Sequence, residues 1–291
     1  MNIGFWNIAG QNSPLLKDLI YNWSQIYNLD LIVLLECKIP EISVLLSLNQ
    51  TQPYAYFLSP SPYPNAYFSV FTKLKSSFSL PIKEERRIQA RNMIDPLYGN
   101  FSLVLIHYQS KLHWDDNDQN AHAPELKRFI DELEEQTNHD RTVVMGDFNM
   151  NPFQLGMVKT TGLHTTMDKR MAKLGNRTVN DKIYKFFYNP MWSFYGEKGK
   201  GEVNGTYFYQ SAKPITYFWN IFDQVILRPN LLEAFDEDSL KILTEINGKK
   251  LLTLQGRVDN TISDHLPVVF ELNLKNISHA TMGESLAGYA W

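Results

Sequence analysis

A carboxylate and a carboxamide stand two residues apart, directly after an apolar run near the middle of the chain. Residues 142–145 (Thr-Val-Val-Met) are β-branched or apolar, Gly146 follows them, and Asp147 and Asn149 come next. In extended backbone, side chains two apart point to the same side. Carboxylate and amide oxygens suit a hard cation such as Mg²⁺, or a phosphate together with its metal. The alternative is an Asx turn, in which both side chains bond only their own backbone.

Six further polar side chains stand at or inside other apolar runs. A buried strand that ends on such a residue presents it at the edge of a sheet, where open α/β sheets bind ligands. A charge inside an apolar strand needs a partner, because burying it alone is costly. The six are Asn7, Glu36 and His107 at the ends of the runs 2–8, 31–35 and 101–106, Asp264 and His265 just before the run 268–272, and Asp223 within the run 222–227.

These residue types together suit metal-assisted hydrolysis of a phosphoester. Carboxylates and amides hold Mg²⁺, which takes oxygen ligands and keeps several waters. Two histidines near such a site can stabilise a phosphorane-like transition state or transfer protons. An aspartate that holds a histidine in one tautomer would explain Asp223 beside His265.

Other catalytic classes lack their sequence signals. The chain has no Gly-rich phosphate loop of a nucleoside triphosphatase and no Cys/His spacing of a zinc site. It also has no nucleophile elbow around a serine.

Buried strands and helices must hold these side chains. Residues 2–8 and 31–35 are predicted strands, and Ser13-Pro14 between them supplies an N-cap and a proline at the first helical position. A strand, a helix and a strand with short connections favour parallel strands. Further strands are predicted at 54–58, 66–72, 80–93 (a pair), 100–106, 216–219, 222–227, 251–254 and 268–272, and helices at 40–50 and 121–136. Residues 115–120, 236–238 and 247–250 are predicted loops or turns, and Asn151-Pro152 is predicted to open a short helix.

The composition indicates one globular domain. The chain has 291 residues, 44% of them hydrophobic, and no Gly/Ser- or Pro-rich linker or internal repeat. Its single cysteine, Cys37, excludes an intrachain disulfide. No apolar run approaches the ~20 residues that span a membrane, and the N-terminus lacks the pattern of a signal peptide. We therefore expect a cytoplasmic protein without a membrane span.

The net charge of −3 excludes a protein that is basic throughout, but one segment is basic. Residues 169–213 contain nine basic and three acidic residues, a local charge of +6, with aromatic residues interleaved. Basic residues among aromatics suit phosphate contact combined with base stacking. The alternative is that the aromatics belong to the core and the lysines to the surface. We treat this basic segment as a candidate substrate-contacting arm.

The ordered set of motifs resembles the endonuclease/exonuclease/phosphatase superfamily, which includes pancreatic-type deoxyribonuclease, abasic-site endonucleases, sphingomyelinases and inositol polyphosphate phosphatases. Each motif is short, but six occur in the right order and run from residue 6 to residue 267. They are Trp6-Asn7, Leu35-Glu36, Ile106-His107 with Ser110-Lys111, Gly146-Asp147-Phe148-Asn149, Phe222-Asp223-Gln224-Val225 and Ser263-Asp264-His265-Leu266-Pro267.

The resemblance implies a four-layer αββα sandwich, an α/β fold in which two mixed β-sheets pack face to face and helices flank them. Residues 1–275 would form this domain, and residues 276–291 would be a C-terminal tail. The resemblance also implies Mg²⁺ as cofactor, replaceable by Mn²⁺ in assays. Glu36 would be the principal metal ligand, Asn7 would support metal or phosphate, and Asp264 would line the metal site.

The resemblance further assigns catalytic roles to five residues. Asp147 would orient or activate the attacking water, and Asn149 would bind the scissile phosphate. His265 would contact the phosphate oxygens, with Asp223 as its orienting partner. His107 would match a second histidine of the deoxyribonuclease-like members and act on the phosphate or the leaving group.

The family does not fix the substrate. The chain lacks the late tryptophan- and cysteine-bearing motif of inositol polyphosphate 5-phosphatases, and it has His107 where abasic-site enzymes carry a tyrosine. With no signal peptide in view, we expect an intracellular phosphodiesterase that acts on DNA or RNA. Lys111 and Arg91 are the candidate substrate-binding residues besides Asn149.

Two other functions remain open. One is a phosphoesterase for a small molecule or a lipid headgroup, whose pocket Arg86, Arg87 and Arg91 could serve. The other is an inactive binding module, which is disfavoured because all the expected metal and phosphate residues are present. Protein partners are not indicated by the sequence.

Overall fold

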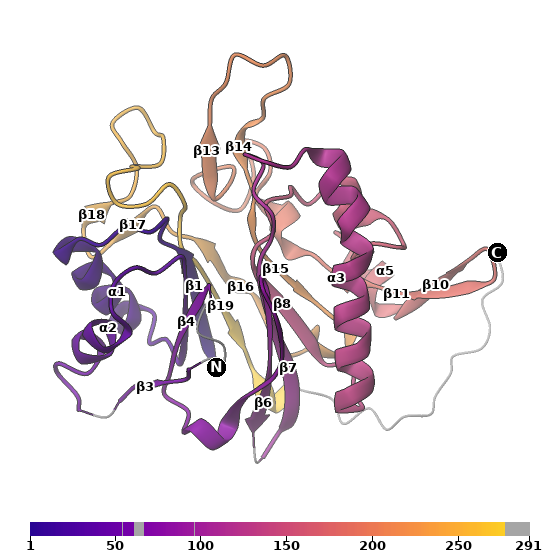
Figure 1. Ribbon diagram of the computed structural model, residues 1–291, viewed down its shortest axis with the longest axis horizontal. Coiled ribbons are helices and arrows are strands. Elements are labelled where there is room, and N and C mark those ends of the chain that lie inside the picture. Colours follow the sequence, from indigo (N-terminus) through magenta and orange to yellow (C-terminus); the bar gives the residue numbers. More distant parts are fainter. Residues whose placement is uncertain (54, 61–66, 96, 277–291) are drawn as a thin grey trace.

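Two mixed β-sheets pack face to face in the centre of the molecule, and helices cover their outer faces (Figure 1). The computed structural model describes residues 1–53, 55–60, 67–95 and 97–276. Helices α1 (Pro14–Ile26) and α2 (Glu41–Leu48) lie outside the first sheet, and α3 (Asp116–Thr137) lies outside the second. The predicted four-layer α/β sandwich is confirmed.

The first sheet has six strands in the order β16-β19-β1-β2-β4-β3. The two central strands, β1 and β2, are parallel, and the other neighbours are antiparallel. Its strands are β1 (Asn2–Asn7), β2 (Leu31–Leu35), β3 (Phe57–Leu58), β4 (Phe68–Thr72), β16 (Phe235–Ile242) and β19 (Val268–Leu272).

The second sheet has seven strands in the order β5-β6-β7-β8-β15-β12-β9. Its central strand β8 runs parallel to β7 and antiparallel to β15. Its strands are β5 (Ser79–Glu85), β6 (Ile88–Asp95), β7 (Gly99–His107), β8 (Thr142–Asp147), β9 (Thr165–Thr166), β12 (Phe187–Tyr188) and β15 (Asp223–Leu227).

Three two-stranded hairpins and several short helices complete the described chain. The hairpins are β10 (Asn176–Val179) with β11 (Lys182–Lys185), β13 (Tyr207–Tyr209) with β14 (Phe218–Asn220), and β17 (Glu245–Ile246) with β18 (Lys249–Lys250). The short helices are α4 (Leu155–Val158), α5 (Lys169–Lys173) and the 3₁₀ turns η1 (Ser76–Phe78), η2 (Pro190–Phe194), η3 (Pro229–Leu231) and η4 (Leu274–Asn276).

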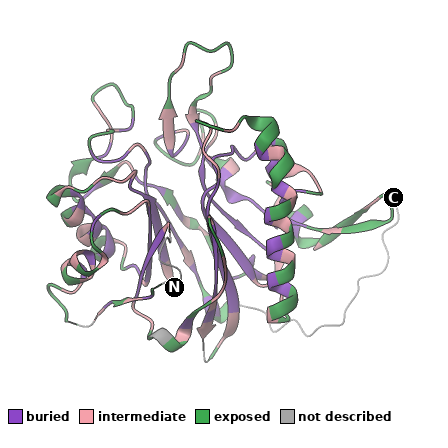
Figure 2. Ribbon diagram, viewed as in Figure 1, coloured by how far each residue is buried: buried purple, intermediate pink, exposed green. Residues whose placement is uncertain are grey.

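Hydrophobic side chains fill the space between the sheets and the space under the helices. The larger cluster joins both sheets and α1, and the smaller one packs α3 against β7 and β8. Figure 2 shows the strands as mostly buried, while the outer side of α3 and the loops are exposed. The strands that carry the predicted site residues therefore lie in the most rigid part of the fold.

Gly146 lets β8 pass directly against β7 just before Asp147. Its φ is +133°, and a Cβ atom there would lie 2.0 Å from the carbonyl oxygen of Ile106. Since that oxygen belongs to the backbone of a central strand, it cannot move aside cheaply. The glycine is therefore required to place Asp147 beside the end of β7.

We expect Gly146→Ala to lower the free energy of unfolding by roughly 3 kcal/mol, because it adds a backbone clash to an unfavourable φ. The matched control is Gly175→Ala, whose φ is +81° but whose Cβ would meet nothing within 4 Å. The control should lose only about 1 kcal/mol. Urea unfolding of both variants measures the difference, and equal losses would show that the clash is relieved in solution.

Most predicted elements are confirmed within one or two residues at their ends. Helix α1 begins after Ser13, whose Oγ accepts a hydrogen bond from the backbone N–H of Leu16 at 3.2 Å. Strand β2 spans the predicted residues 31–35, and β19 spans the predicted residues 268–272. Tyr54, at the start of the strand predicted at 54–58, and Ala66, at the start of the one at 66–72, lie outside the described residues.

Four local predictions were wrong. The stretch 115–120 is not a loop: Asp115 and Asp118 form a capping box, and α3 begins at Asp116. Residues 236–238 lie inside β16, although the pairing with β19 is interrupted between Asp236 and Lys241 and the N–H of Asp238 donates to Asp236 Oδ1 at 3.0 Å. The short helix after Asn151-Pro152 begins only at Leu155, and residues 251–254 form no strand beyond one isolated bridge at Leu252.

No helix among the described residues is long and apolar enough to cross a membrane. Residues 277–291, which make up nearly all of the predicted C-terminal tail, lie outside the described part of the chain.

Candidate active site

The predicted site residues meet at one end of the two sheets because of the strand register. Asp147 ends β8, with His107 opposite it on the parallel strand β7 and Asp223 opposite it on the antiparallel strand β15. In the first sheet Asn7 is paired with Leu35, so Glu36 emerges beside it. The end of β1 faces the end of β8 across the sandwich, since Asn7 donates to Asp147.

The backbone turns sharply at two of these positions. Glu36 has a φ of +52° and Asn149 a φ of +49°, both in the left-handed region. The backbone N–H of Asn149 donates to Oδ1 of Asp147 at 2.8 Å. This bond forms the Asx turn that was the alternative interpretation of the sequence. The turn leaves Oδ2 of Asp147 facing the other site residues, so the turn and a functional role are compatible.

A hydrogen-bond network joins the first and second sheets around Asp147. Asn7 Nδ2 lies 3.2 Å from Asp147 Oδ2 and 3.4 Å from Glu36 Oε1. Asn149 Nδ2 donates to the same Oδ2 at 3.1 Å and to the carbonyl oxygen of Tyr108 at 3.1 Å. Both amide hydrogens of Asn149 thus have acceptors. The amide orients Asp147, and contact with a phosphate requires one of these bonds to be exchanged.

His107 lies between an acid and a cation. Its Nε2 is 3.0 Å from Glu36 Oε1 and 4.0 Å from Asp147 Oδ2. Arg87 Nη1 is 3.4 Å from its Nδ1. Because a guanidinium can only donate, Nδ1 is the acceptor and Nε2 carries the hydrogen that points to Glu36. The ring of Tyr67 covers the imidazole at 5.0 Å, and the Arg87 guanidinium lies 4.9 Å from the centre of that same tyrosine ring.

His265 and Asp223 form the buried ion pair that the sequence suggested. Nδ1 of His265 is 2.6 Å from Asp223 Oδ2, and Asp223 is fully buried. Burial by itself lowers the pKa of His265, but Asp223, with help from Asp147 and Asp264, raises it to about 10. The imidazole is therefore a cation at neutral pH, suited to stabilising negative charge on a phosphoryl group.

Hydrogen bonds to the backbone hold this histidine in place. Ser263 Oγ donates to the carbonyl oxygen of Asn7 at 2.7 Å and accepts from the N–H of His265 at 3.1 Å. Trp6 Nε1 donates to the carbonyl oxygen of His265 at 2.9 Å. These contacts fasten the turn 263–265 to the end of β1, which explains why Trp6 and Ser263 accompany Asn7 and His265 in the motifs.

The carboxylates of the site differ in their proton affinity. Burial raises the pKa of Asp147 to about 6. The hydrogen bond from His107 holds the pKa of Glu36 below its usual value, against the opposite effect of burial. Burial raises the pKa of Asp264, and the Glu36 carboxylate adds to that rise. Asp147 is thus poised to take a proton near neutral pH, while Glu36 stays ionised.

The donor set fits Mg²⁺ as an open site that would be completed by water. Asp264 Oδ1 is buried and has no hydrogen-bond partner in the described chain, although His265 Nε2 lies 3.8 Å away. The Glu36 carboxylate adds to the effect of burial in raising the pKa of Asp264, so the two acids interact electrostatically. Within the described ranges no three acidic, histidine or cysteine side chains converge as a ready-made cage. Mg²⁺ is commonly held by only one or two carboxylates and several waters.

The structure does not bring Arg91 to this cluster. Its side chain is fully buried, and its guanidinium donates to Gln89 Oε1 and to Oγ and the backbone oxygen of Ser59. Burial lowers its pKa to about 10. Arg91 therefore links β6 of one sheet to the end of β3 of the other. Lys111 does lie near the site: it pairs with Asp116, and its Nζ is 5.9 Å from the centre of the Phe222 ring.

The basic segment 169–213 does not form one surface beside the site. The hairpin β10–β11 lies beyond α3 in Figure 1, and neighbouring Tyr188 pairs with Leu227, at the end of β15 opposite Asp223. Several of its cations are bound in ion pairs: Lys169 with Glu237, Lys173 with Glu233, and Lys185 with Glu134 and Asp140. Phe186, Phe187, Tyr188 and Phe194 are buried. Core aromatics and surface lysines thus describe most of this segment.

Three neighbours of the site carried no motif in the sequence. Arg87 and Tyr67 contact His107, and Tyr207 lies 4.8 Å from the ring of His265. Arg87 lies inside the predicted strand pair 80–93, in a run of charges, and was named only as a candidate for a small-molecule pocket. Its proximity to His107 results from the pairing of β6 with β7. No sequence signal distinguishes these two tyrosines from the chain's other tyrosines.

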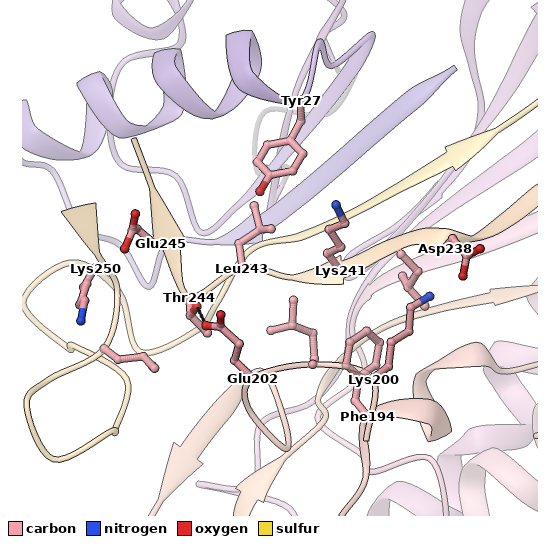
Figure 3. Close-up of a pocket in the computed structure, with 14 residues that line it drawn as sticks. Tyr27, Phe194, Lys200, Glu202, Asp238, Lys241, Leu243, Thr244, Glu245 and Lys250 are labelled. Atoms are coloured by element: carbon pink, nitrogen blue, oxygen red, sulfur yellow. Dashed lines mark hydrogen bonds between the residues drawn. The ribbon is translucent and has the colours of Figure 1, made fainter. Parts of the chain in front are cut away.

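A large hollow lies elsewhere, beside β16. Its volume is about 840 Å³, and its lining includes Lys200, Glu202, Lys241 and Tyr27 (Figure 3). None of the predicted site residues lines it. Its size alone is therefore no guide to the chemistry.

Two mixed sheets with helices outside them define a four-layer α/β protein, and a cluster of acids and histidines lies at the shared end of the sheets. A profile of the Endonuclease/Exonuclease/phosphatase family matches residues 65–274, most of the chain. The chain belongs to this family, which supports a hydrolase that acts on phosphoester bonds. The matched range includes His107, Asp147, Asn149, Asp223 and His265, whereas Asn7 and Glu36 precede it.

Solved structures with the same fold have low sequence identity to this chain. An endonuclease/exonuclease/phosphatase family protein from Bacteroides thetaiotaomicron is 13% identical, with 97% of this chain and 98% of that chain covered and a TM-score of 0.56. The human Nocturnin catalytic domain with bound sulfate is 13% identical, with 93% of each chain covered and a TM-score of 0.51. D. rerio TDP2 complexed with single strand DNA product is 17% identical, with 93% and 97% covered and a TM-score of 0.51. No curated protein matches the chain.

Proposed function

We propose that this protein is a Mg²⁺-dependent phosphodiesterase that hydrolyses nucleic acid by metal-assisted attack of water. The observation that carries the proposal is the convergence of Asp147, the His265–Asp223 pair and the Glu36 carboxylate at one end of the sandwich. A base, a fixed cation and a metal-binding acid are three groups that suit phosphodiester hydrolysis by water. Mn²⁺ is expected to substitute for Mg²⁺.

The chain's own residues take distinct roles in this proposal. Asp147, with its raised pKa, accepts a proton from the attacking water, and Asn149 orients it and meets the phosphate. His265 stabilises the charge that develops on the phosphoryl oxygens, and Asp223 keeps it cationic and aligned. The Nε2 hydrogen of His107 points to Glu36, and it would serve the phosphate or the leaving group by exchanging that contact.

Glu36, Asp264 and Asn7 would hold the metal. When bound, Mg²⁺ would polarise the phosphoryl group and lower the pKa of water. The unpartnered Oδ1 of Asp264 supports this assignment, because a buried carboxylate oxygen without a hydrogen bond is costly unless a ligand meets it.

Two features support a nucleic acid as substrate. The half-buried ring of Tyr207 lies beside His265, the exposed ring of Tyr209 lies beyond it, and Lys111 Nζ is 5.9 Å from the centre of the neighbouring Phe222 ring. The D. rerio TDP2 structure of the same fold contains a single strand DNA product. Apart from Tyr207, Tyr209 and Lys213, the basic segment 169–213 gives no support, since Lys169, Lys173 and Lys185 are held in ion pairs and its hairpin β10–β11 lies at the other end of β15.

A phosphoesterase for a lipid headgroup is the second candidate. Three loops at the same end of the molecule carry highly exposed aliphatic side chains, namely Leu112, Ile215 and Leu254, with exposed fractions of 86%, 74% and 102%. Apolar side chains on loops around a site suit an amphiphilic surface.

Cleavage assays with single- and double-stranded DNA and RNA test the proposal. We expect cleavage with Mg²⁺, loss of cleavage with EDTA, and recovery when Mg²⁺ or Mn²⁺ is added in excess, because the metal supplies part of the charge stabilisation. Cleavage that persists in EDTA would refute the metal assignment. Turnover of bis(p-nitrophenyl) phosphate without any nucleic-acid cleavage would favour the lipid or small-molecule candidate. No turnover and no Mg²⁺ binding would indicate an inactive binding module.

A further inference from the structure

Three aromatic rings form a continuous array that starts at His265. Tyr207 lies 4.8 Å from the His265 ring and is stacked with Phe222 at 5.3 Å and an angle of 27°. Tyr209 is nearly parallel to Tyr207, with ring centres 6.4 Å apart and an angle of 17°. We call Phe222, Tyr207 and Tyr209 the aromatic array.

The inner end of the array is fastened to the candidate active site. Tyr207 forms a β-bridge with His265, and the N–H of Leu266 donates to the carbonyl oxygen of Thr206 at 2.8 Å. Thr206 Oγ1 also accepts from the N–H of Asp223 at 3.1 Å. The base of the hairpin β13–β14 therefore cannot move without disturbing the His265–Asp223 pair.

The outer end of the array is open to solvent. Tyr209 is 50% exposed, and the hairpin loop that follows it stands away from the sheets (Figure 1). An aromatic side chain buries a large apolar area when it contacts a partner, so an exposed ring near the candidate active site can bind a ligand. Tyr207 lies between Tyr209 and His265, so a group that stacks on Tyr209 would lie one ring away from a group held at His265.

Cations flank the array, but acids of the candidate active site also lie near its inner ring, because Asp264 and Asp147 add to the effect of burial in raising the pKa of Tyr207. Lys111 Nζ, which also pairs with Asp116, lies 5.9 Å from the centre of the Phe222 ring at one end, and Lys213 is exposed in the hairpin loop at the other. Residues 207–222 contain no acidic residue. Planar rings flanked by cations complement a chain in which planar bases alternate with phosphates.

We propose that the aromatic array is a stacking subsite for an unpaired base next to the scissile phosphate. The inference rests on the proposed function and narrows its substrate to single-stranded nucleic acid. Bases in a duplex are already stacked on each other, so only an unpaired base can offer its face to Tyr209. Stacking on aromatic rings tolerates every base, and we therefore expect little sequence preference.

Substitutions of Tyr209 separate stacking from simple apolar contact. Tyr209→Trp keeps an aromatic face, whereas Tyr209→Leu keeps an apolar side chain without one. We expect Tyr209→Leu to raise the KM for a single-stranded oligonucleotide about tenfold and to change kcat little, and we expect Tyr209→Trp to retain the wild-type KM. The matched control is Tyr184→Leu, on β11 at the other end of the molecule, which should not change the KM.

An oligonucleotide with abasic sites makes the test independent of folding. If the array stacks on bases, wild type and Tyr209→Leu should have equal KM values for this ligand. Anisotropy of the labelled single strand in EDTA measures binding without cleavage and should show the same order of affinities. Equal affinity of wild type and Tyr209→Leu for the normal strand would overturn the inference.

The outcomes also distinguish failure of the subsite from failure of the proposed function. If wild type cleaves single strands and Tyr209→Leu has a wild-type KM, only the subsite is refuted. If wild type hydrolyses bis(p-nitrophenyl) phosphate but neither binds nor cleaves any oligonucleotide, the nucleic-acid assignment fails along with the subsite. If the wild-type protein and Tyr209→Leu both sediment with phosphatidylcholine vesicles, the result would assign the hairpin to a lipid surface instead, because apolar contact alone would then be sufficient.

Discussion

The His265→Ala variant should lose roughly 10²- to 10³-fold in kcat, the effect of removing one preorganised donor to an oxyanion. The Asp223 carboxylate raises the pKa of His265 to about 10 against the opposing effect of burial, so wild type presents a cation at neutral pH. Alanine removes that cation and leaves Asp223 buried and unpaired. The loss should therefore appear mainly in kcat, because the charge matters most as the phosphoryl group becomes more negative.

Steady-state kinetics on a phosphodiester at saturating Mg²⁺ measures this loss. His164→Ala is the matched control, since His164 is also buried. Its Nε2 accepts a hydrogen bond at 2.9 Å from Arg177, which belongs to the hairpin β10–β11. It should lower stability and spare kcat. A His265→Ala variant with wild-type kcat and an intact fold would remove His265 from the mechanism.

The Glu36→Gln variant should lose on the order of 10³-fold in activity, because it removes the ionised carboxylate assigned to the metal. Glutamine keeps the shape of the side chain and can still meet Nε2 of His107, which lies 3.0 Å from Glu36 Oε1. The fold should therefore persist, and any activity that remains should need a higher Mg²⁺ concentration. This combination separates lost metal binding from lost structure.

Activity as a function of Mg²⁺ concentration and direct Mn²⁺ binding are the two measurements. Glu125→Gln is the control, because Glu125 is an exposed acid on α3 whose side chain is 66% accessible. Circular dichroism should show wild-type content of helix and strand in both variants. If Glu36→Gln kept the wild-type Mg²⁺ dependence, the metal site would have to be sought at other carboxylates.

Local patterns in the sequence determined most of the strands that build the site. Continuous apolar runs predicted β2 and β19 at their observed bounds, and the strand-end rule selected Glu36, His107 and Asp147, which the structure brings together. A strand that is buried on both faces appears in the sequence as a continuous apolar run, because the side chains on both of its faces must be apolar. The order of the motifs then identified the family.

Long-range packing decided what the sequence could not show. Arg91 reads as a free cation in the chain, but strand pairing carries it between the sheets to Ser59. The charges of the basic segment sum to +6 in the sequence, yet folding places Glu134, Glu233 and Glu237 against its lysines. Net charge along a chain counts residues and ignores distances, whereas electrostatic energy depends on distance.

The sequence by itself determined the fold class, the family and the set of candidate acids and histidines, because continuous apolar runs and short motifs indicate each of them. Only the tertiary structure decided that Arg87 and Tyr67 frame His107, that Ser263 and Trp6 anchor His265, and that Tyr207 and Tyr209 extend from it. These contacts join residues far apart in the chain. Their existence depends on which strands pair with each other and on how the two sheets pack, and a local pattern does not name the partner strand.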